Sequence, residues 1–349
     1  MDINSLHQKF KENSRLQEEN TEKIDSKHVE IIKNSKENFK NLEWSNFRNW
    51  KDQNDMGLRY PMTYLSKIFL GIKKNKIIDF ILKIPRKRLN HYFHYSSMLD
   101  DIEIVKSLGG DYLLNENPQN KTPGAIKFPL VEGYSVSSRW LRYVYILTRI
   151  IKMKLLKQDS VWLDIGSYYG GLEGLVKKYF PDIKIIMVDF NHQLARSYIY
   201  LNKLYPEANH ILPKHVTSIQ NIESIPKGSI MYVEIEDFDK LNNFKINLTT
   251  NFFSLGEMKK QTFKNYIQSD IVQNSEIIYF ANRYSSSPFF EKTYDDAINI
   301  FDYKINKNLI YLDVFPISQY QITPRKILNR DFFRNISSQY FEMIWKNKN

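Results

Sequence analysis

The sequence of 349 residues contains no cysteine. This absence excludes disulfide bonds, zinc sites with thiolate ligands and a cysteine nucleophile. Long apolar runs are also missing, because none reaches the about 18 to 20 residues that cross a bilayer. Residues 1–20 lack the apolar core of a signal peptide. The sequence therefore predicts a cytoplasmic protein and leaves open a peripheral contact with the inner face of the membrane.

Acidic residues are fewer than basic ones, at 39 against 50, so the net charge is +11. A charge of this sign suits nucleic acid, an anionic membrane surface or an anionic substrate. Part of the excess is compositional, since lysine is abundant along the whole chain. Residues 83–95 interleave basic and aromatic side chains, as do segments that bind RNA or membranes, but a basic helix face over an aromatic core has the same pattern. We do not expect nucleic acid as the partner.

Glycine and proline are sparse, at 12 residues each, and several of them lie with asparagine in residues 115–134. This stretch predicts a linker or surface loop. Before it, residues 1–45 are charged and predict a solvated helical segment, whereas residues 40–100 cluster aromatic side chains in short amphipathic helices. We expect a helical N-terminal region over residues 1–130, for substrate recognition or oligomerisation, and a second domain over residues 131–349.

After the linker, the pattern alternates between helices and buried strands. The stretch SVSSRWLRYVYILTRIIKMKLL, residues 135–156, has apolar residues at helical spacing. SVWLDIG predicts a strand that ends at Asp164, GGLEGLVKKYF predicts the next helix, and DIKIIMVDF predicts a strand that ends at Asp189. This alternation predicts a doubly wound parallel sheet, in which a glycine-rich turn between a strand and a helix is the context of a nucleotide-type site.

The glycine-rich turn could hold one of two classes of cofactor. A dinucleotide site needs a middle glycine beside the pyrophosphate, and this chain has Tyr168 at that position. Asp164, two residues before Gly166, would repel a pyrophosphate but attract the cationic groups of S-adenosylmethionine. Asp189 can accept hydrogen bonds from both ribose hydroxyls, and Phe190 offers a ring face to the base. The turn therefore favours S-adenosylmethionine, and a dinucleotide site or a purely structural turn stay open.

Three motifs within residues 115–285 carry a resemblance: VSSRWLRYVYILTRII, DIGSYYGGL and NFFSLGEMKKQTFKNYI. Together they resemble the sugar O-methyltransferases of bacterial polysaccharide gene clusters, a family of class I S-adenosylmethionine-dependent methyltransferases. The resemblance implies a Rossmann-like fold with a doubly wound sheet of seven strands, S-adenosylmethionine as cofactor and a sugar hydroxyl as acceptor. Ser167 and Tyr168 depart from the pattern, because they stand where the family has glycines. They put the shape of the methionine pocket in doubt.

The predicted cofactor-binding residues come from this turn, the two strand ends and two further segments. They are Asp164, Gly166, Ser167, Tyr168, Gly170, Gly171, Asp189, Phe190, His215 and Arg139. Arg139 has a plain alternative as part of a surface helix. No metal site is expected, since His91 and His94 have no acid nearby in the sequence.

The catalytic residues are expected where parallel strands end, beside the cofactor. Glu257 is the predicted general base for the sugar hydroxyl, and Asn251 and Ser254 are predicted to orient the acceptor. Ser254 and Glu257 also have the spacing of a capping box that would open a helix over residues 257–268, so Glu257 could be only a cap. His210 and His215 are alternative bases. The residues predicted to contact substrate are Arg283 and Tyr284.

Together these features predict an O-methyltransferase that uses S-adenosylmethionine and acts on a sugar hydroxyl of a surface polysaccharide or its precursor. The expected partner is a sugar, a nucleotide sugar or a glycan, and a homo-oligomer stays open. One alternative is an RNA methyltransferase, supported by residues 83–95 and the net charge. The other is a non-catalytic protein of this fold in a glycan-assembly complex, supported by Ser167 and Tyr168 in the turn.

Overall fold

A computed structural model describes most of the second half of the chain and shorter parts of the first. Within the described residues, none of the helices is long and apolar enough to cross a bilayer. Residues 83–95, with His91 and His94, lie outside them. The described residues are 2–15, 98–114, 130–131, 133–136, 138–285, 297–317, 326–327, 330–331 and 340–347.

Contacts within the chain divide it into two units. The first contains Met1–Phe47, Ile150–Phe315 and Gln339–Asn349, and the second contains Arg48–Arg149 and Pro316–Ser338. The predicted division at residues 130 and 131 stays a prediction. The second unit includes a helical stretch at residues 98–107, α5 (Asp111–Leu114), most of α6 (Ser138–Lys152) and two short hairpins, β1 (Leu130–Val131) with β2 (Tyr134–Ser135) and β10 (Lys326–Ile327) with β11 (Arg330–Asp331). The helix α6 confirms the helix predicted before the sheet.

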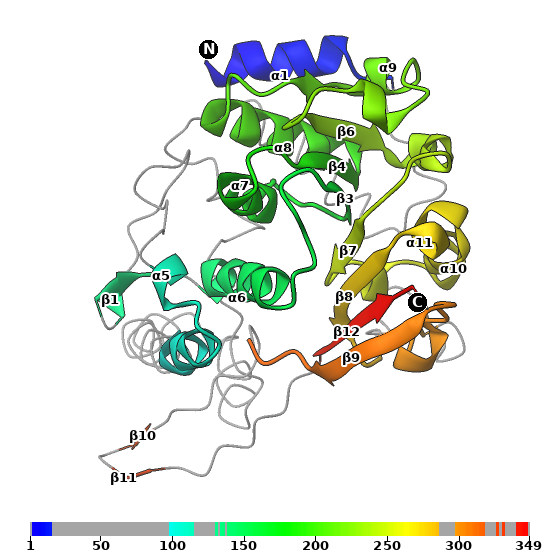
Figure 1. Cartoon of the computed structure of the whole chain (residues 1–349). Helices are drawn as coiled ribbons and strands as arrows, with labels where there is room; N and C mark the ends of the chain where they lie inside the picture. Colours follow the sequence, from blue (N-terminus) through cyan, green and yellow to red (C-terminus); the bar gives the residue numbers. More distant parts are fainter. Residues whose placement is uncertain are drawn as a thin grey trace, which may run out of the picture. The chain divides into compact units, whose positions relative to one another are not determined.

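The first unit contains a sheet of eight strands (Figure 1) in the order β5-β6-β4-β3-β7-β8-β12-β9. All pairs from β5 to β8 are parallel, and β12 is antiparallel to both of its neighbours. The doubly wound α/β fold is confirmed, with one strand more than the seven expected. The strands are β3 (Val161–Ile165), β4 (Lys184–Asp189), β5 (His210–Ile211), β6 (Ile230–Glu234), β7 (Leu248–Phe252), β8 (Ile277–Arg283), β9 (Asn308–Val314) and β12 (Tyr340–Lys346).

At one edge of the sheet, β5 pairs with the outer side of β6 through only two residues. The helices and turns of the first unit are α1 (Ile3–Glu12), α7 (Gly171–Tyr179), α8 (Asn191–Leu204), α9 (Pro213–Val216), η4 (Ile222–Ser224), η5 (Ile235–Leu241), η6 (Leu255–Glu257), α10 (Lys260–Gln268), α11 (Asp270–Asn274) and η8 (Ile300–Asp302).

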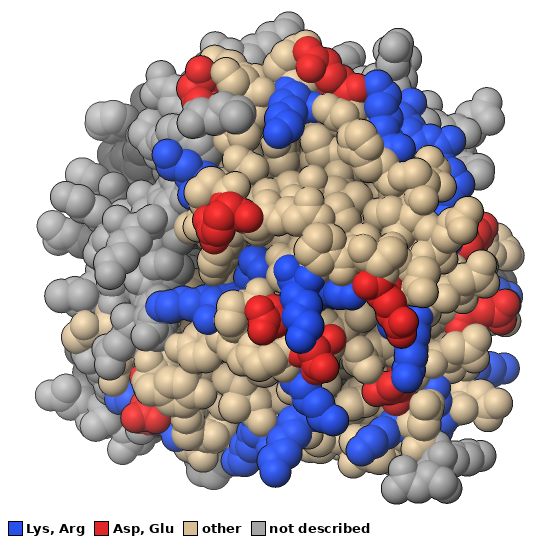
Figure 2. All heavy atoms as spheres, turned by 45° about the horizontal axis from the view of Figure 1, so that its top comes forward, with Lys and Arg blue, Asp and Glu red and all other residues tan. Residues whose placement is uncertain are grey.

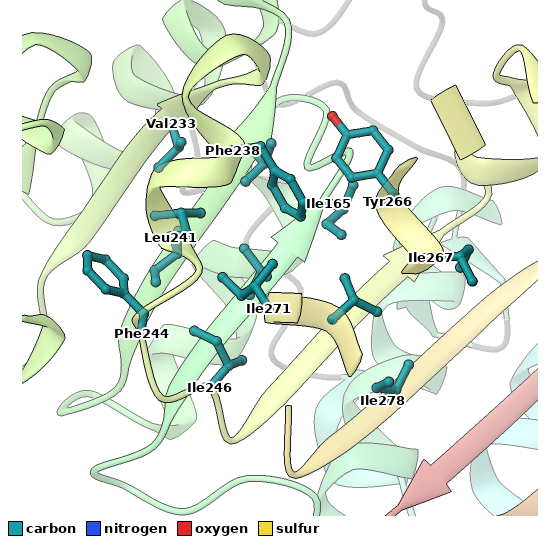
Figure 3. Packing of buried hydrophobic residues seen from close by; sticks show 14 of the residues in the cluster. Ile165, Val233, Phe238, Leu241, Phe244, Ile246, Tyr266, Ile267, Ile271 and Ile278 are labelled. Atoms are coloured by element: carbon teal, nitrogen blue, oxygen red, sulfur yellow. The ribbon is translucent and has the colours of Figure 1, made fainter. Parts of the chain in front are cut away.

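Alternate side chains of the buried strands fill the core on one face of the sheet. This hydrophobic core cluster includes three fully buried strand residues, Leu163 of β3, Ile186 of β4 and Ile278 of β8. Phe238 of η5 and Ile271 of α11 belong to the same cluster, and Figure 3 shows them with Ile278. This arrangement follows from strands that are apolar on both faces, because a parallel sheet must be covered on both sides.

The helix α1 packs against α8 (Figure 1) and belongs to the same unit as the sheet. Ile3, Leu6 and Phe10 are buried, and they repeat at the spacing of one helix face. The Phe10 ring lies 5.9 Å from Tyr198 of α8 and 6.5 Å from Tyr232 of β6, between ring centroids. The expectation of a solvated segment is therefore wrong for residues 3–12.

Candidate functional site

A cavity of about 290 Å³ lies at the carboxyl ends of β3, β4, β6 and β7. This is the edge of an open parallel sheet at which ligands bind. Its walls come from the ends of β3 and β4, from η5, from the turn after β7 and from α10. Figure 3 shows Ile165, Phe238 and Tyr266 of these walls together. The residues around it are Ile165, Gly166, Val188, Asp189, Phe190, Ile235, Glu236, Phe238, Asp239, Ser254, Glu257, Met258, Lys259, Thr262, Asn265 and Tyr266.

The glycine-rich turn approaches this cavity through Gly166. Its φ is +85°, and a Cβ added there would lie 2.2 Å from the Ser254 Oγ. The backbone N–H of Gly166 donates to the Val188 carbonyl at 2.8 Å, which joins the turn to β4. Gly170 ends the turn as the residue before α7, with a φ of +84°. Only glycine fits the close approach at Gly166, so this position is fixed by geometry as the sequence predicts.

Tyr168 adopts the left-handed conformation in the middle of the turn, with a φ of +58°. Its carbonyl accepts a hydrogen bond from the Ser197 hydroxyl of α8 at 2.8 Å. Its ring lies under the Arg196 guanidinium, at 5.0 Å from the centroid, and meets the Tyr169 ring edge to face at 5.0 Å. The side chain of Tyr168 thus packs toward α8 and is not one of the residues that line the cavity.

Asp189 ends β4 and lines the cavity. Its two carboxylate oxygens accept backbone hydrogen bonds, Oδ2 from Tyr168 at 2.9 Å and Oδ1 from Phe190 at 2.7 Å. A carboxylate has about four lone-pair positions, so it can accept further hydrogen bonds from a ligand. The same bonds connect the glycine-rich turn to the end of β4, which fixes the orientation of Asp189.

Asp164 lies beneath the turn and pairs with Glu173 of α7, and both are buried. Burial raises the pKa of Asp164, whereas the neighbouring Glu173 carboxyl and the hydrogen bond from the Thr250 hydroxyl lower it. Burial and then the charge of Asp164 raise the pKa of Glu173 well above its ordinary value. Two neighbouring buried carboxyl groups do not both ionise readily, so we assign a proton to Glu173, the group whose pKa is raised well above its ordinary value. Asp164 is predicted from the sequence, but Glu173 was missed.

Asn251 is fully buried at the end of β7, and its amide holds several segments together. Its Nδ2 donates to the Ile165 carbonyl at 2.6 Å and to the Ser254 Oγ at 2.5 Å. Its Oδ1 accepts from the Leu255 N–H at 3.1 Å and from Asn282 at 3.0 Å. Through these bonds Asn251 positions the turn that carries Ser254. Its predicted role toward an acceptor stays a prediction.

Glu257 lines the cavity, and 40% of its side chain is exposed. Arg283 donates to the Glu257 Oε1 from its Nη2 at 3.3 Å, so two residues predicted for different roles are brought together. The capping-box alternative is wrong, because the Ser254 side chain makes no capping hydrogen bond and α10 begins only at Lys260. Lys259 is extended, with a ψ of 142°, and separates the turn from the helix.

The charges around the cavity are mainly negative. Its lining includes Asp189, Glu236, Asp239 and Glu257, against Lys259 as the one basic residue among the described lining residues. On the face shown in Figure 2, basic and acidic side chains are interspersed. The net positive charge of the chain is therefore not concentrated at the cavity.

Several predicted residues lie elsewhere. His215 is exposed on α9, where its Nε2 lies 3.2 Å from the Asn13 Oδ1. His210 bonds to the Tyr232 hydroxyl at 2.9 Å, and neither histidine lines the cavity. Tyr284 packs against the core cluster. Arg139 belongs to the second unit, so its predicted role stays a prediction.

Gly171 and Ser167 complete the predicted cofactor set. Gly171 is the first residue of α7, directly after the turn. Ser167 is buried within the turn, and its Oγ has no hydrogen-bond partner among the described residues. Neither residue lines the cavity, and their predicted role toward a cofactor stays a prediction.

Sequence reasoning missed two walls of the cavity. Ile235, Glu236, Phe238 and Asp239 come from η5, a short 3₁₀ helix after β6. Thr262, Asn265 and Tyr266 come from α10. The spacing of Thr262, Asn265 and Tyr266 is that of one helix face, which was the available signal.

No family model and no curated protein matches the sequence. Among solved structures, the chain is similar to a fibrillarin/Nop5p complex, with 10% identity, a TM-score of 0.35 and coverage of 63% of this chain and 87% of that one. The chain is similar to the methyltransferase domain of bacterial CtHen1 with 11% identity and a TM-score of 0.34. That match covers 59% of this chain and 97% of the other. It is also similar to a SAM-dependent methyltransferase from Geobacter sulfurreducens in complex with S-adenosyl-L-homocysteine. Here the identity is 11% and the TM-score 0.28, and the match covers 42% of this chain and 49% of that one.

Identities and TM-scores this low carry no inference about function. The sheet order described above is by itself that of a Rossmann-like, doubly wound α/β fold.

Proposed function

We propose that the chain is an S-adenosylmethionine-dependent methyltransferase whose donor site is the cavity at the ends of β3, β4 and β6. The observation that carries this proposal is the charge of the lining, with four carboxylates and one lysine. Carboxylates attract a donor that has a sulfonium and an ammonium group, and they repel the pyrophosphate of a dinucleotide. The volume of about 290 Å³ is close to the lower end of the range of about 300 to 1,000 Å³ for small-molecule sites.

The residues present fit this donor. Asp189 is oriented by two backbone hydrogen bonds and can accept the ribose hydroxyls, and Phe190 and Ile235 provide apolar contacts for a base. When bound, S-adenosylmethionine supplies an activated methyl group on a positively charged sulfur. The work of the protein is then to hold donor and acceptor in line, which supplies much of the rate of such a reaction.

We further propose a sugar hydroxyl as the acceptor, in a surface polysaccharide or its precursor. This part depends on the resemblance of the motifs around Asp164 and Asn251 to sugar O-methyltransferases. A hydroxyl is a weak nucleophile, so a general base that takes its proton accelerates the transfer. Glu257 fits this role, because it is half-buried in the cavity wall and Arg283 holds its carboxylate. The Arg283 contact also connects β8 to the site.

Calorimetry with S-adenosylmethionine and with NADH tests the donor. We expect binding of the first and none of the second, with at least a tenfold loss of affinity in Asp189→Ala. Asp182→Ala, an exposed residue before β4, is the matched control and should bind as the wild type. Failure of the wild type to bind S-adenosylmethionine would refute the assignment.

Transfer of a labelled methyl group to a panel of sugars, nucleotide sugars and glycans tests the acceptor. With an active acceptor, Glu257→Gln should reduce turnover by about 100-fold or more and leave donor affinity unchanged. Glu223→Gln, at an exposed glutamate of η4, controls for the loss of one charge. Equal turnover in Glu257→Gln and the wild type would remove Glu257 from the reaction.

A further inference from the structure

A short segment after α1 reaches the walls of the cavity. We name Asn13, Ser14 and Arg15 the N-terminal clasp. The Ser14 hydroxyl donates to the Glu234 Oε1 at 2.6 Å, and both side chains are buried. Asn191 donates to the same Glu234 oxygen at 2.7 Å and also to the Ser14 Oγ. Ser14 therefore joins the end of β6 to the first residue of α8.

The two residues joined by Ser14 are direct neighbours of cavity residues. Phe190 precedes Asn191, and Ile235 follows Glu234, and both line the cavity. These are the two walls that would lie on either side of a flat base. The Ser14 hydroxyl of the N-terminal clasp thus adds a second connection between them, beside the direct bond from Asn191 to Glu234.

Arg15 acts on the adjacent part of the same wall. Its guanidinium forms an ion pair with Asp237, whose side chain is only 5% exposed. Asp237 lies within η5, between the cavity residues Glu236 and Phe238. A 3₁₀ helix has poor hydrogen-bond geometry and depends on outside contacts to stay ordered.

The N-terminal clasp is itself anchored on the side of α1. Before it, Phe10 is fully buried among aromatic rings of α8 and β6. At its first residue, the Asn13 carbonyl accepts from the Lys214 N–H at 2.9 Å, and the Asn13 Oδ1 lies 3.2 Å from the His215 Nε2. Ser14 and Arg15 are therefore held in place by contacts that do not involve the cavity.

We propose that the N-terminal clasp is a positioning element of the donor site: Ser14 and Arg15 hold the Phe190 and η5 walls at the spacing that binds the donor. This inference rests on the proposed function for the identity of the ligand. It predicts an effect on donor affinity and on the order of η5, while the reacting groups stay in place.

Calorimetry with S-adenosylhomocysteine on the full chain tests the first effect. Arg15→Ala and Ser14→Ala should each weaken binding by about five- to tenfold or more, and Arg15→Lys should restore most of the affinity lost in Arg15→Ala. Lys11→Ala removes one exposed positive charge from α1 and should bind as the wild type. In turnover, KM for the donor should rise while kcat at saturation stays constant. Unchanged affinity in folded Arg15→Ala and Ser14→Ala would overturn the inference.

Amide hydrogen exchange without ligand separates this inference from the proposed function. Residues 235–241 should exchange several-fold faster in Arg15→Ala and Ser14→Ala than in the wild type or in Lys11→Ala. If the wild type binds no S-adenosylhomocysteine, the proposed function fails, and the exchange result still decides whether the N-terminal clasp orders η5. Equal exchange of residues 235–241 in all four proteins would refute the inference that the N-terminal clasp orders η5.

Discussion

Tyr168 is the residue whose replacement tests most directly how the turn is built. In Tyr168→Ala the chain loses the contact with Arg196 at 5.0 Å and the edge-to-face contact with Tyr169 at 5.0 Å. The first is worth about 0.5 to 2 kcal/mol and the second about 0.5 to 1.5 kcal/mol. We therefore expect the free energy of unfolding to fall by about 1 to 3 kcal/mol.

Tyr168→Gly loses the same contacts but also changes the conformational energy of the backbone at position 168. The φ of +58° at this position costs a residue with a side chain about 1 to 2 kcal/mol, and glycine adopts it without that cost. Glycine also adds about 0.5 to 1 kcal/mol of entropy to the unfolded chain. On balance the glycine variant should be about 1 kcal/mol more stable than the alanine variant.

Urea denaturation of both variants measures which of them is more stable. Calorimetry with S-adenosylmethionine measures their donor affinity. Donor affinity should stay at the wild-type value in both, since the Tyr168 ring packs on α8 and not in the cavity. Tyr112→Ala, which removes a half-exposed ring from the other unit, controls for the loss of an aromatic side chain. Equal stability of the two variants would refute the left-handed backbone conformation at Tyr168. A higher donor affinity in either variant would show that the Tyr168 ring obstructs the donor.

Three further changes test the site. Gly166→Ala should lower the free energy of unfolding by about 1 to 3 kcal/mol and weaken donor binding, because the new Cβ would lie 2.2 Å from the Ser254 Oγ. Adding Ser254→Gly to this variant should recover part of the stability and part of the donor affinity, both measured by calorimetry. No recovery would refute the clash. Asn251→Ala leaves buried partners without hydrogen bonds and should cost about 1 to 3 kcal/mol in urea denaturation, where a neutral result would argue against a structural role. The pKa of Glu173 is raised above its ordinary 4.5, so its proton stabilises the fold below that pH and the contribution is lost as the pH rises through the folded-state pKa. Glu173→Gln should therefore lose less stability than the wild type as the pH rises above the ordinary pKa of 4.5, and parallel curves of stability against pH would contradict the raised pKa.

The parts of the site that were predicted correctly from the sequence are those that local patterns determine. Two strands rich in apolar residues were predicted to end at Asp164 and Asp189, and the structure ends β3 one residue later, at Ile165, and β4 at Asp189. The helix after the turn begins at Gly171, and Gly170 before it is an N-cap without a side-chain hydrogen bond. Because parallel strands end at one edge, these patterns also place Gly166 and Asp189 beside one cavity.

The parts that were missed depend on contacts between distant segments. The start of α10 at Lys260 was misplaced because Ser254 bonds to Asn251 across the turn instead of capping a helix. The partner of Asp164 is Glu173, which has no recognisable motif of its own. The burial of α1 had a visible signal in the helical spacing of its apolar residues, but the surrounding charges masked it.

The contact between Ser14 and Glu234 has a consequence for the order of events during synthesis. The two residues are 220 positions apart, so Ser14 leaves the ribosome long before its partner exists. At about 5 to 20 residues per second, the delay is roughly 10 to 40 s. During this time α1, a helix of 10 residues, is too short to be stable by itself. Its apolar residues are then available to chaperones until β6 and α8 have emerged.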